Sequence, residues 1–336
     1  GTVSVPGGVL TEVPLRDPQG RLVAGDYSAD RRTWTTREQL AYATTYTWSG
    51  AARGPQGTVT PLAGSFTTVR PAKLVRGVLN IGDGRVVGIA APIEIQFDAH
   101  VSDRAAVERA LSVRTSVPVE GAWGWLPDEN GGSRVHWRPR EYWPPGTEVT
   151  VTADLYGVHF GDGAYGRANL SSTFRIGRAQ IVKADVRSHR MIVVRDGVVV
   201  ANYPASYGLS SDPDRTTRSG IHVVTEKHAV KRMVSRQFGY DVLSQWAVRI
   251  SNNGEFIHAN PATTAQQGSA NVTHGCINLS PQNAREYYQT ALYGDPVEVT
   301  GSGVPLSARD GDIWDWTLSW EAWRKLSALD DEAPGG

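Results

Sequence analysis

The sequence predicts a mostly β protein: two small β-sandwich domains, then a third β-rich domain with one clear helix. Two observations support this fold class. Short apolar or alternating runs recur along the first 178 residues, separated by turn-forming residues at the spacing of β-sandwiches. The β pattern then continues until a helical segment follows the single cysteine. The 336 residues are enough for about two average or three small domains.

Six runs predict strands in the first half of the chain. They are Val9–Val13, Tyr42–Trp48, Gly57–Leu62, Ile93–Phe97, Val135–Trp137 and Val149–Leu155. One helix, Asp103–Leu111, interrupts them, with Asp103 as its N-cap. A hinge near residues 69–73 divides this half into domains over residues 1–69 and 70–178. The first is short for a sandwich, as though its opening strand were trimmed.

A second boundary at Ile176-Gly177-Arg178 opens a domain over residues 179–301. Its predicted strands are Gln180–Asp185, Arg190–Arg195, Gly197–Tyr203, Gly220–Thr225, Trp246–Ile250 and Pro296–Thr300. Arg195-Asp196-Gly197 between two runs indicates a hairpin. Ser280-Pro281 is typical of an N-cap and first helical position, so a helix is expected over Gln282–Leu292.

The tail, residues 302–336, carries three tryptophans at helical spacing. Trp316, Trp320 and Trp323 are separated by four and three residues, which places them on one face of a helix. We interpret this stripe as an extension that packs on the body of the protein rather than as a ligand site.

Composition excludes several classes of function. The chain is 40% hydrophobic and 20% charged, which is typical of a globular protein and not of a disordered one. Its 34 basic and 34 acidic residues balance, which argues against a nucleic-acid or anionic-membrane partner. No run approaches the roughly 20 apolar residues of a transmembrane helix. We expect membrane attachment only through an N-terminal anchor upstream of this sequence.

The lone cysteine leaves two interpretations, an inert buried thiol or a nucleophile with histidine partners. Cys276 stands just before the predicted helix, whose terminal N–H groups would lower the pKa of the thiol. His274 is two residues away, and His258 ends an apolar run. Gly275 permits a tight turn that leaves backbone N–H groups free for an oxyanion. Together these residues favour an activated nucleophile.

Two other interpretations of the same residues stay open. One cysteine and two histidines could ligate zinc, although a fourth ligand is not evident and His-Gly-Cys is not a usual spacing. An inert thiol would leave Gly275 and the adjacent helix cap unexplained.

These residues resemble a known signature. His258, fourteen residues, then Thr273-His274-Gly275-Cys276-Ile277-Asn278 is similar to the motif of the L,D-transpeptidases, the YkuD domain family. Other segments resemble mycobacterial members of the family in the expected order: Thr33-Trp34-Thr35-Thr36, Pro118-Val119-Glu120-Gly121, Trp137-Arg138-Pro139, Tyr156-Gly157-Val158 and Trp314-Asp315-Trp316. The resemblance implies two immunoglobulin-like domains, a YkuD catalytic domain and a Trp-rich C-terminal extension.

The resemblance also implies a reaction and its partners. A cysteine thiolate attacks the meso-diaminopimelate carbonyl of a donor tetrapeptide stem, D-Ala leaves, and the thioester is transferred to the amine of an acceptor diaminopimelate. This 3→3 cross-link belongs to peptidoglycan synthesis, outside the cytoplasm, in a protein anchored at its N-terminus. Carbapenems are the expected inhibitors, and neither cofactor nor metal is implied.

The family's catalytic roles fall on matching positions. Cys276 corresponds to the nucleophile and His258 to the general base, whose ring is oriented by the backbone carbonyl of Ala259. His274 corresponds to the histidine beside the nucleophile, where it either supports the thiolate and donor pocket or holds the turn.

Three further residues have expected roles. The N–H groups of Gly275 and Cys276 should form the oxyanion hole, with Tyr240 as a side-chain donor or simply a packing aromatic. Asn278 should fix the loop rather than touch substrate.

The chain departs from the family pattern beside this site. The lid over residues 226–239 is shorter than in close relatives, Thr217-Arg218 replaces a Thr-Pro motif, and small or polar residues replace aromatics at Ala262 and Asn252. These changes predict a wider donor site and slower acylation by β-lactams.

Competing functions are a sortase-like transpeptidase, an NlpC/P60-type peptidase and a non-catalytic wall-binding scaffold. A sortase would need an arginine on a strand after the cysteine, whereas Arg285 is predicted in a helix. An NlpC/P60 peptidase has cysteine before histidine. The intact motif argues against the scaffold.

Overall fold

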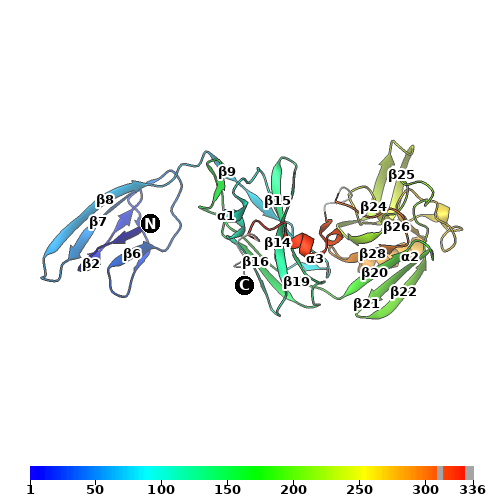
Figure 1. The fold of residues 1–336 in the computed structure, drawn as a ribbon, viewed down its shortest axis with the longest axis horizontal. Helices are drawn as coiled ribbons and strands as arrows, with labels where there is room; N and C mark the ends of the chain where they lie inside the picture. The colour runs from blue at the N-terminus through cyan, green and yellow to red at the C-terminus, as the bar shows by residue number, and fades with distance from the viewer. Residues whose placement is uncertain (309–312, 330–336) are drawn as a thin grey trace. The chain divides into compact units, whose positions relative to one another are not determined.

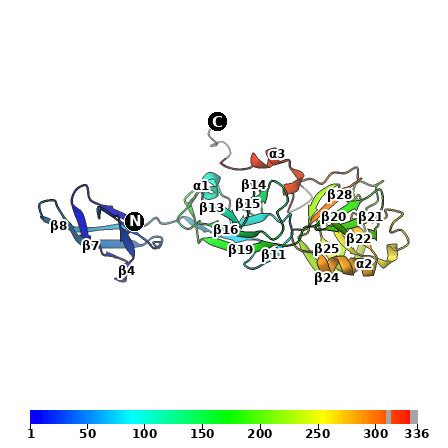
Figure 2. The same cartoon turned by 90° about the horizontal axis from the view of Figure 1, so that it is seen from below.

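A computed structural model describes residues 1–308 and 313–329 (Figures 1 and 2). The chain forms two compact units, residues 1–74 with 162–165, and residues 75–161 with the chain from 166 onward. The domain boundaries expected at residues 69, 178 and 301 stay predictions. Of the tail expected over residues 302–336, residues 309–312 and 330–336 lie outside the described residues.

The first unit is built from two small antiparallel sheets. One has the order β1-β6-β5, and the other β2-β7-β3-β4 with β8 paired to β7. The strands are β1 (Thr2–Ser4), β2 (Val9–Glu12), β3 (Leu15–Arg16), β4 (Leu22–Val23), β5 (Gly25–Tyr27), β6 (Thr33–Thr36), β7 (Thr45–Arg53) and β8 (Val59–Thr67). Leu10, Leu15, Trp34 and Tyr46 are among the side chains that form its core.

The second unit begins with a sandwich of two four-stranded sheets, ordered β10-β12-β15-β14 and β11-β19-β16-β13. A small sheet, β17-β18-β9, includes residues 73, 74, 164 and 165, which are grouped with the first unit. The elements are β9 (Lys73–Val75), β10 (Gly77–Leu79), β11 (Val86–Val87), β12 (Ile93–Phe97), α1 (Arg104–Glu108), β13 (Leu111–Thr115), β14 (Gly121–Glu129), β15 (Gly132–Pro139), β16 (Glu148–Ala153), β17 (His159–Gly161), β18 (Ala164–Gly166) and β19 (Leu170–Ile176).

The same unit continues with two further sheets, ordered β22-β21-β20-β28-β23 and β24-β25-β26-β27. Their strands are β20 (Gln180–Asp185), β21 (Arg190–Arg195), β22 (Val198–Pro204), β23 (Gly220–Val223), β24 (Glu226–Ser235), β25 (Tyr240–Arg249), β26 (Phe256–Ala259), β27 (Ile277–Leu279) and β28 (Pro296–Thr300). Short helices are η1 (Pro261–Thr263), α2 (Pro281–Thr290), η2 (Asp315–Thr317) and α3 (Trp320–Arg324).

One apolar core lies between these two sheets. Val182, Val193 and Val299 from the first sheet pack with Ile257 and Ile277 from the second, all almost fully buried. Helix α2 packs on β25 and β26 and closes this core (Figure 2). The core therefore fixes β26 and β27, the two strands that contain His258 and Asn278, the ends of the sequence motif.

Several local predictions are confirmed. Asp103 caps α1 by accepting a hydrogen bond from the N–H of Ala106, although the helix ends at Glu108 because Leu111 begins β13. Ser280 caps α2 in the same way. Asp196 and Gly197 both have positive φ and form the predicted hairpin turn. No described helix is both long and apolar enough to cross a bilayer.

The tryptophan stripe packs on the body, as predicted, but not as one helix. Trp316 lies in η2, whereas Trp320 and Trp323 lie in α3, because the chain extends at Leu318 and Ser319 starts a new helix. Helix α3 contacts β14. The Arg138 guanidinium of β15 lies 4.7 to 5.4 Å from the three indole rings and anchors the segment.

Candidate active site

The candidate site lies where two parallel strands begin their pairing. β26 and β27 pair with His258 opposite Asn278, and Cys276 immediately precedes β27. The seventeen-residue spacing between His258 and Cys276 therefore becomes proximity, because the intervening chain loops out through η1 and returns to the neighbouring strand. The two ends of the sequence motif therefore lie on adjacent strands of one sheet.

A cavity of about 240 Å³ gathers most of the predicted site residues. Its lining includes His258, His274, Cys276, Asn278 and Tyr240. Gly275 and Ala259 contribute backbone beside it. The structure thus brings together all seven candidate residues from three strands and one loop.

His258 is held as a neutral base. Its Nδ1–H donates to the carbonyl oxygen of Ala259 at 2.9 Å, which leaves Nε2 as the acceptor nitrogen. The imidazole is only 7% exposed, and burial lowers its pKa from the ordinary value. The ring is therefore uncharged at neutral pH and can accept a proton. The backbone contact explains why alanine is accepted at position 259.

The prediction that a helix terminus lowers the pKa of Cys276 is wrong. β27 lies between the cysteine and α2, so the thiol is not at the helix N-terminus. The pKa of the thiol is raised to about 12, because burial and, more weakly, the Glu255 charge raise it by more than a hydrogen bond with the Phe256 backbone lowers it. Cys276 is a protonated thiol at rest, with Sγ 3.6 Å from the Gly254 carbonyl. It needs a base to become a nucleophile.

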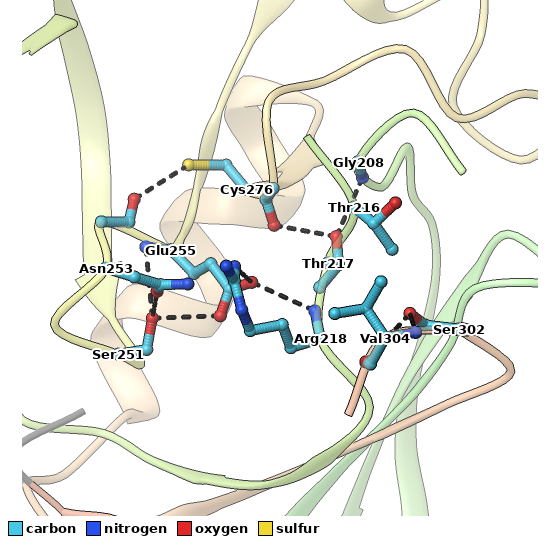
Figure 3. A network of polar contacts seen from close by, with 12 residues as sticks. Gly208, Thr216, Thr217, Arg218, Ser251, Asn253, Glu255, Cys276, Ser302 and Val304 are labelled. Carbon is cyan, nitrogen blue, oxygen red and sulfur yellow. Dashed lines mark hydrogen bonds and ion pairs between the residues drawn. The ribbon is translucent and has the colours of Figure 1, made fainter. Parts of the chain in front are cut away.

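Two threonines orient the backbone around Gly275, whose φ of +110° favours glycine. Thr217 Oγ1 donates to the Gly275 carbonyl at 2.8 Å and accepts from the Gly208 N–H at 2.9 Å (Figure 3). Thr273 Oγ1 donates to the Cys276 carbonyl at 2.6 Å. In a trans peptide the N–H points opposite to the C=O, so Thr217 turns the Cys276 N–H away from itself.

A buried ionic network that the sequence did not reveal lies next to Cys276 (Figure 3). The Glu255 side chain is nearly inaccessible. Its Oε1 accepts from the Arg218 N–H at 3.1 Å and lies 3.4 Å from the Arg218 guanidinium. Its Oε2 accepts from Ser251 Oγ at 3.0 Å, and His222 lies 3.5 Å away. The only sequence signal is a carboxylate beside the apolar run of β26.

This network gives Thr217-Arg218 a structural role. Thr217 holds the turn at Gly275, and Arg218 balances the charge of Glu255. The departure from the family pattern at this dipeptide thus falls on residues that contact Gly275 and Glu255, next to Cys276.

Glu255→Gln should lower the pKa of the Cys276 thiol, because it removes one of the two effects that raise it. Alkylation by iodoacetamide below that pKa should become about three- to tenfold faster, since each unit of pKa changes the thiolate fraction tenfold. The measurement is the alkylation rate between pH 6 and 9. Glu286→Gln, an exposed change on α2, is the matched control. Unchanged alkylation in folded Glu255→Gln would contradict the electrostatic role.

His274 and Tyr240 form an aromatic wall beside the thiol. The exposed His274 ring lies 4.6 Å from Phe238 and 5.4 Å from Tyr240. Burial and the nearby Arg215 lower the pKa of His274, so the ring carries no charge at neutral pH. Burial, then the nearby Cys276, raises the pKa of Tyr240, which keeps its hydroxyl as a hydrogen-bond donor.

The competing sites find less support. Arg285 lies in α2 with its guanidinium 5.6 Å from the Trp246 ring, away from the cavity lining. No group of three or more potential metal ligands occurs among the described residues.

The expected lid over residues 226–239 is the first arm and turn of the β24–β25 hairpin.

The Asn278 side-chain amide does not use all of its hydrogen-bonding groups, as a purely structural residue would. Its Nδ2 lies 3.4 Å from Thr263 Oγ1, while its buried Oδ1 has no hydrogen-bond partner among the described residues. The side chain lines the cavity, but the oxygen itself is shielded from solvent and stands as an unpartnered buried acceptor in the cavity wall.

Comparisons with known proteins agree with this architecture. Residues 1–159 match the bacterial Ig domain family Big_10, and residues 179–299 match the L,D-transpeptidase catalytic domain, YkuD. L,D-transpeptidase 5 of Mycobacterium tuberculosis is 56% identical over 329 residues, 98% of this chain and 73% of that protein. L,D-transpeptidase 2 of the same species is 38% identical over 97% of this chain and 80% of that protein.

Solved structures are also similar. LD transpeptidase LdtMt1 in complex with imipenem has a TM-score of 0.57 and 35% identity, over 68% of this chain and all of that one. L,D-transpeptidase 3 from M. tuberculosis with a faropenem-derived adduct has a TM-score of 0.54 and 30% identity, over 67% of this chain and 97% of that one.

These findings define an enzyme in which an Ig-like domain precedes a YkuD catalytic domain. The chain belongs to the L,D-transpeptidase family. The resemblance expected from the motif around Cys276 is confirmed.

Proposed function

We propose that Cys276 and His258 are the catalytic pair of this L,D-transpeptidase, acting on peptidoglycan stem peptides outside the cytoplasm. One arrangement carries the proposal: the only cysteine of the chain shares a cavity with an imidazole whose Nδ1 is bonded to Ala259 and whose Nε2 is free to take a proton. A high thiol pKa beside a neutral base requires proton transfer on attack.

In the first half-reaction, His258 takes the thiol proton and Cys276 attacks the diaminopimelate carbonyl of the donor stem. The bond to D-Ala breaks, the proton passes from His258 to the leaving amine, and the stem remains as a thioester. In the second, an acceptor amine loses a proton to His258 and attacks the thioester. The C–S bond breaks and the proton returns to sulfur, so one cross-link forms and one D-Ala leaves.

Backbone around Gly275 supports the charged intermediates. The Gly275 and Cys276 N–H groups are the proposed oxyanion donors, with the Tyr240 hydroxyl as a third. The hold of Thr217 on the Gly275 carbonyl supports this role for the Cys276 N–H, because it orients the donor before substrate arrives. We place His274 as an aromatic contact of the lid rather than as a charged partner of the thiolate.

Carbapenems are the inhibitors that we propose for the same thiol. Attack of Cys276 on the β-lactam carbonyl forms a thioester and breaks the ring C–N bond, so the amine leaving group takes a proton and stays tethered to the acyl group. Imipenem and faropenem-derived ligands are bound in two of the related structures. The slower acylation expected from a wider donor site stays a prediction of this proposal.

Turnover of a synthetic tetrapeptide stem tests the function. Mass spectrometry should detect free D-Ala and a dimer with the mass of two tetrapeptides minus one D-Ala. A tripeptide that already lacks D-Ala is the matched control, because it can accept but cannot donate. D-Ala release without a dimer would indicate a carboxypeptidase, and no product from folded protein would contradict the proposal.

A further inference from the structure

A second cavity lies beside the catalytic one, under the β24–β25 hairpin. It has a volume of about 520 Å³ and shares Met233, Tyr240 and His274 with the cavity that holds Cys276. Met233 also packs on the core cluster that contains the cysteine. A group bound in this second cavity is therefore adjacent to the reacting centre. The two cavities differ in chemistry, because the second is lined by four basic side chains.

Three of these four cations are neutralised by the protein. Each of the three arginines that line the cavity is paired with a carboxylate: Arg218 with Glu255 at 3.4 Å, Arg249 with Glu226 at 2.9 Å, and Arg232 with Asp241 at 2.8 Å. Since each guanidinium already has a carboxylate, none of the three offers a full positive charge to a ligand.

Lys231 is different. Among the described residues, no carboxylate lies within 4 Å of its ammonium group. The side chain is half-buried on the same face of β24 as Met233, two residues along the strand, so it faces the cavity. Asp214 also borders the cavity, but it is exposed to solvent, where water screens its charge. The Lys231 charge acts on Glu226 only at longer range, and that carboxylate is already bonded to Arg249 and His228. Lys231 is therefore the cation of this cavity with no described carboxylate in direct contact.

We infer that Lys231 binds a carboxylate of the peptide stem in this second cavity and so determines which stems react. The inference rests on the proposed function. A charge-assisted hydrogen bond to a carboxylate fixes the carbon that bears it. Two substrate carboxylates lie next to reacting atoms: that of the terminal D-Ala, beside the bond that breaks, and that on the carbon bearing the acceptor amine.

Paired substrates separate the two carboxylates. The donor arm compares the tetrapeptide with its C-terminal amide and follows the release of D-Ala from the first and of D-alaninamide from the second. The acceptor arm uses one unmodified donor and compares tripeptide acceptors whose diaminopimelate side-chain carboxyl is free or amidated. In one arm the wild type should prefer the acid about ten- to hundredfold in kcat/KM, the effect of a hydrogen bond between charged groups.

Lys231→Gln should reduce that preference to about twofold, because kcat/KM falls for the acid substrate and stays the same for the amide. Lys231→Arg should restore the preference. Arg236→Gln, in the turn of the same hairpin and outside the cavity lining, removes an equal charge as the control. No preference for the acid in either arm, or a preference retained by Lys231→Gln, would overturn this inference and leave the proposed function standing. A folded but inactive wild type would instead contradict the proposed function and this inference with it.

Discussion

Cys276→Ala should abolish both peptide turnover and adduct formation with a carbapenem. The chain has one cysteine, and its thiol lies in the cavity with His258, so no other sulfur can form the thioester. Intact mass after incubation with imipenem should show one adduct per wild-type chain and none on the variant. D-Ala release from the tetrapeptide should fall to the uncatalysed level, because covalent catalysis is lost completely.

The variant should remain folded, because the change removes one sulfur atom from a site that is 9% exposed. Circular dichroism and thermal melting check this point. An adduct on folded Cys276→Ala would place acylation on another residue. If neither protein forms an adduct, the tetrapeptide assay decides between a site that rejects the drug and a scaffold without activity.

His258→Gln should slow acylation of Cys276 by about 10²- to 10⁴-fold, the usual contribution of a positioned general base. The effect should be large here because burial raises the thiol pKa to about 12, which leaves very little thiolate for a reaction without a base. The measurement is the rate of imipenem acylation by stopped-flow or quenched mass spectrometry. His274→Gln is the comparison, and we expect a much smaller loss from it.

The pH profile gives a second check on His258. Its pKa is lowered by burial, and the base works only when neutral. The wild-type rate should therefore persist below the ordinary histidine pKa of about 6.5 and fall only at more acidic pH. His258→Gln should lose this acidic limb and depend instead on the thiol, with a rate that rises through the alkaline range. An unchanged profile in the variant would exclude His258 as the base.

Local sequence was enough to predict much of this protein. The turn at Asp196-Gly197 and the cap at Ser280 depend on interactions within a few residues, which is why the structure confirms both. The motif from His258 to Asn278 also spans little chain, and its two ends join through the pairing of β26 with β27.

Predictions that depended on distant neighbours fared differently. The tryptophan tail has helical spacing, yet it bends between η2 and α3, where Trp316 donates to the Ala90 carbonyl and Trp323 to that of Ala122. Periodicity describes a single helix and contains no information about such remote acceptors. The pKa of Cys276 was expected in the wrong direction for the same reason, because its proximity to α2 along the chain hid the strand between them.

Residue order supplied the groups of the candidate site: a cysteine, a histidine and a glycine at the turn between them. The surroundings that tune these groups come together only in the folded chain. Glu255 acts on the Cys276 thiol from the residue before β26, Thr217 and Arg218 contact Gly275 and Glu255 from another segment, and Lys231 lies on the β24–β25 hairpin. Electrostatic effects depend on distance and burial in space, and neither quantity is written in the order of the residues.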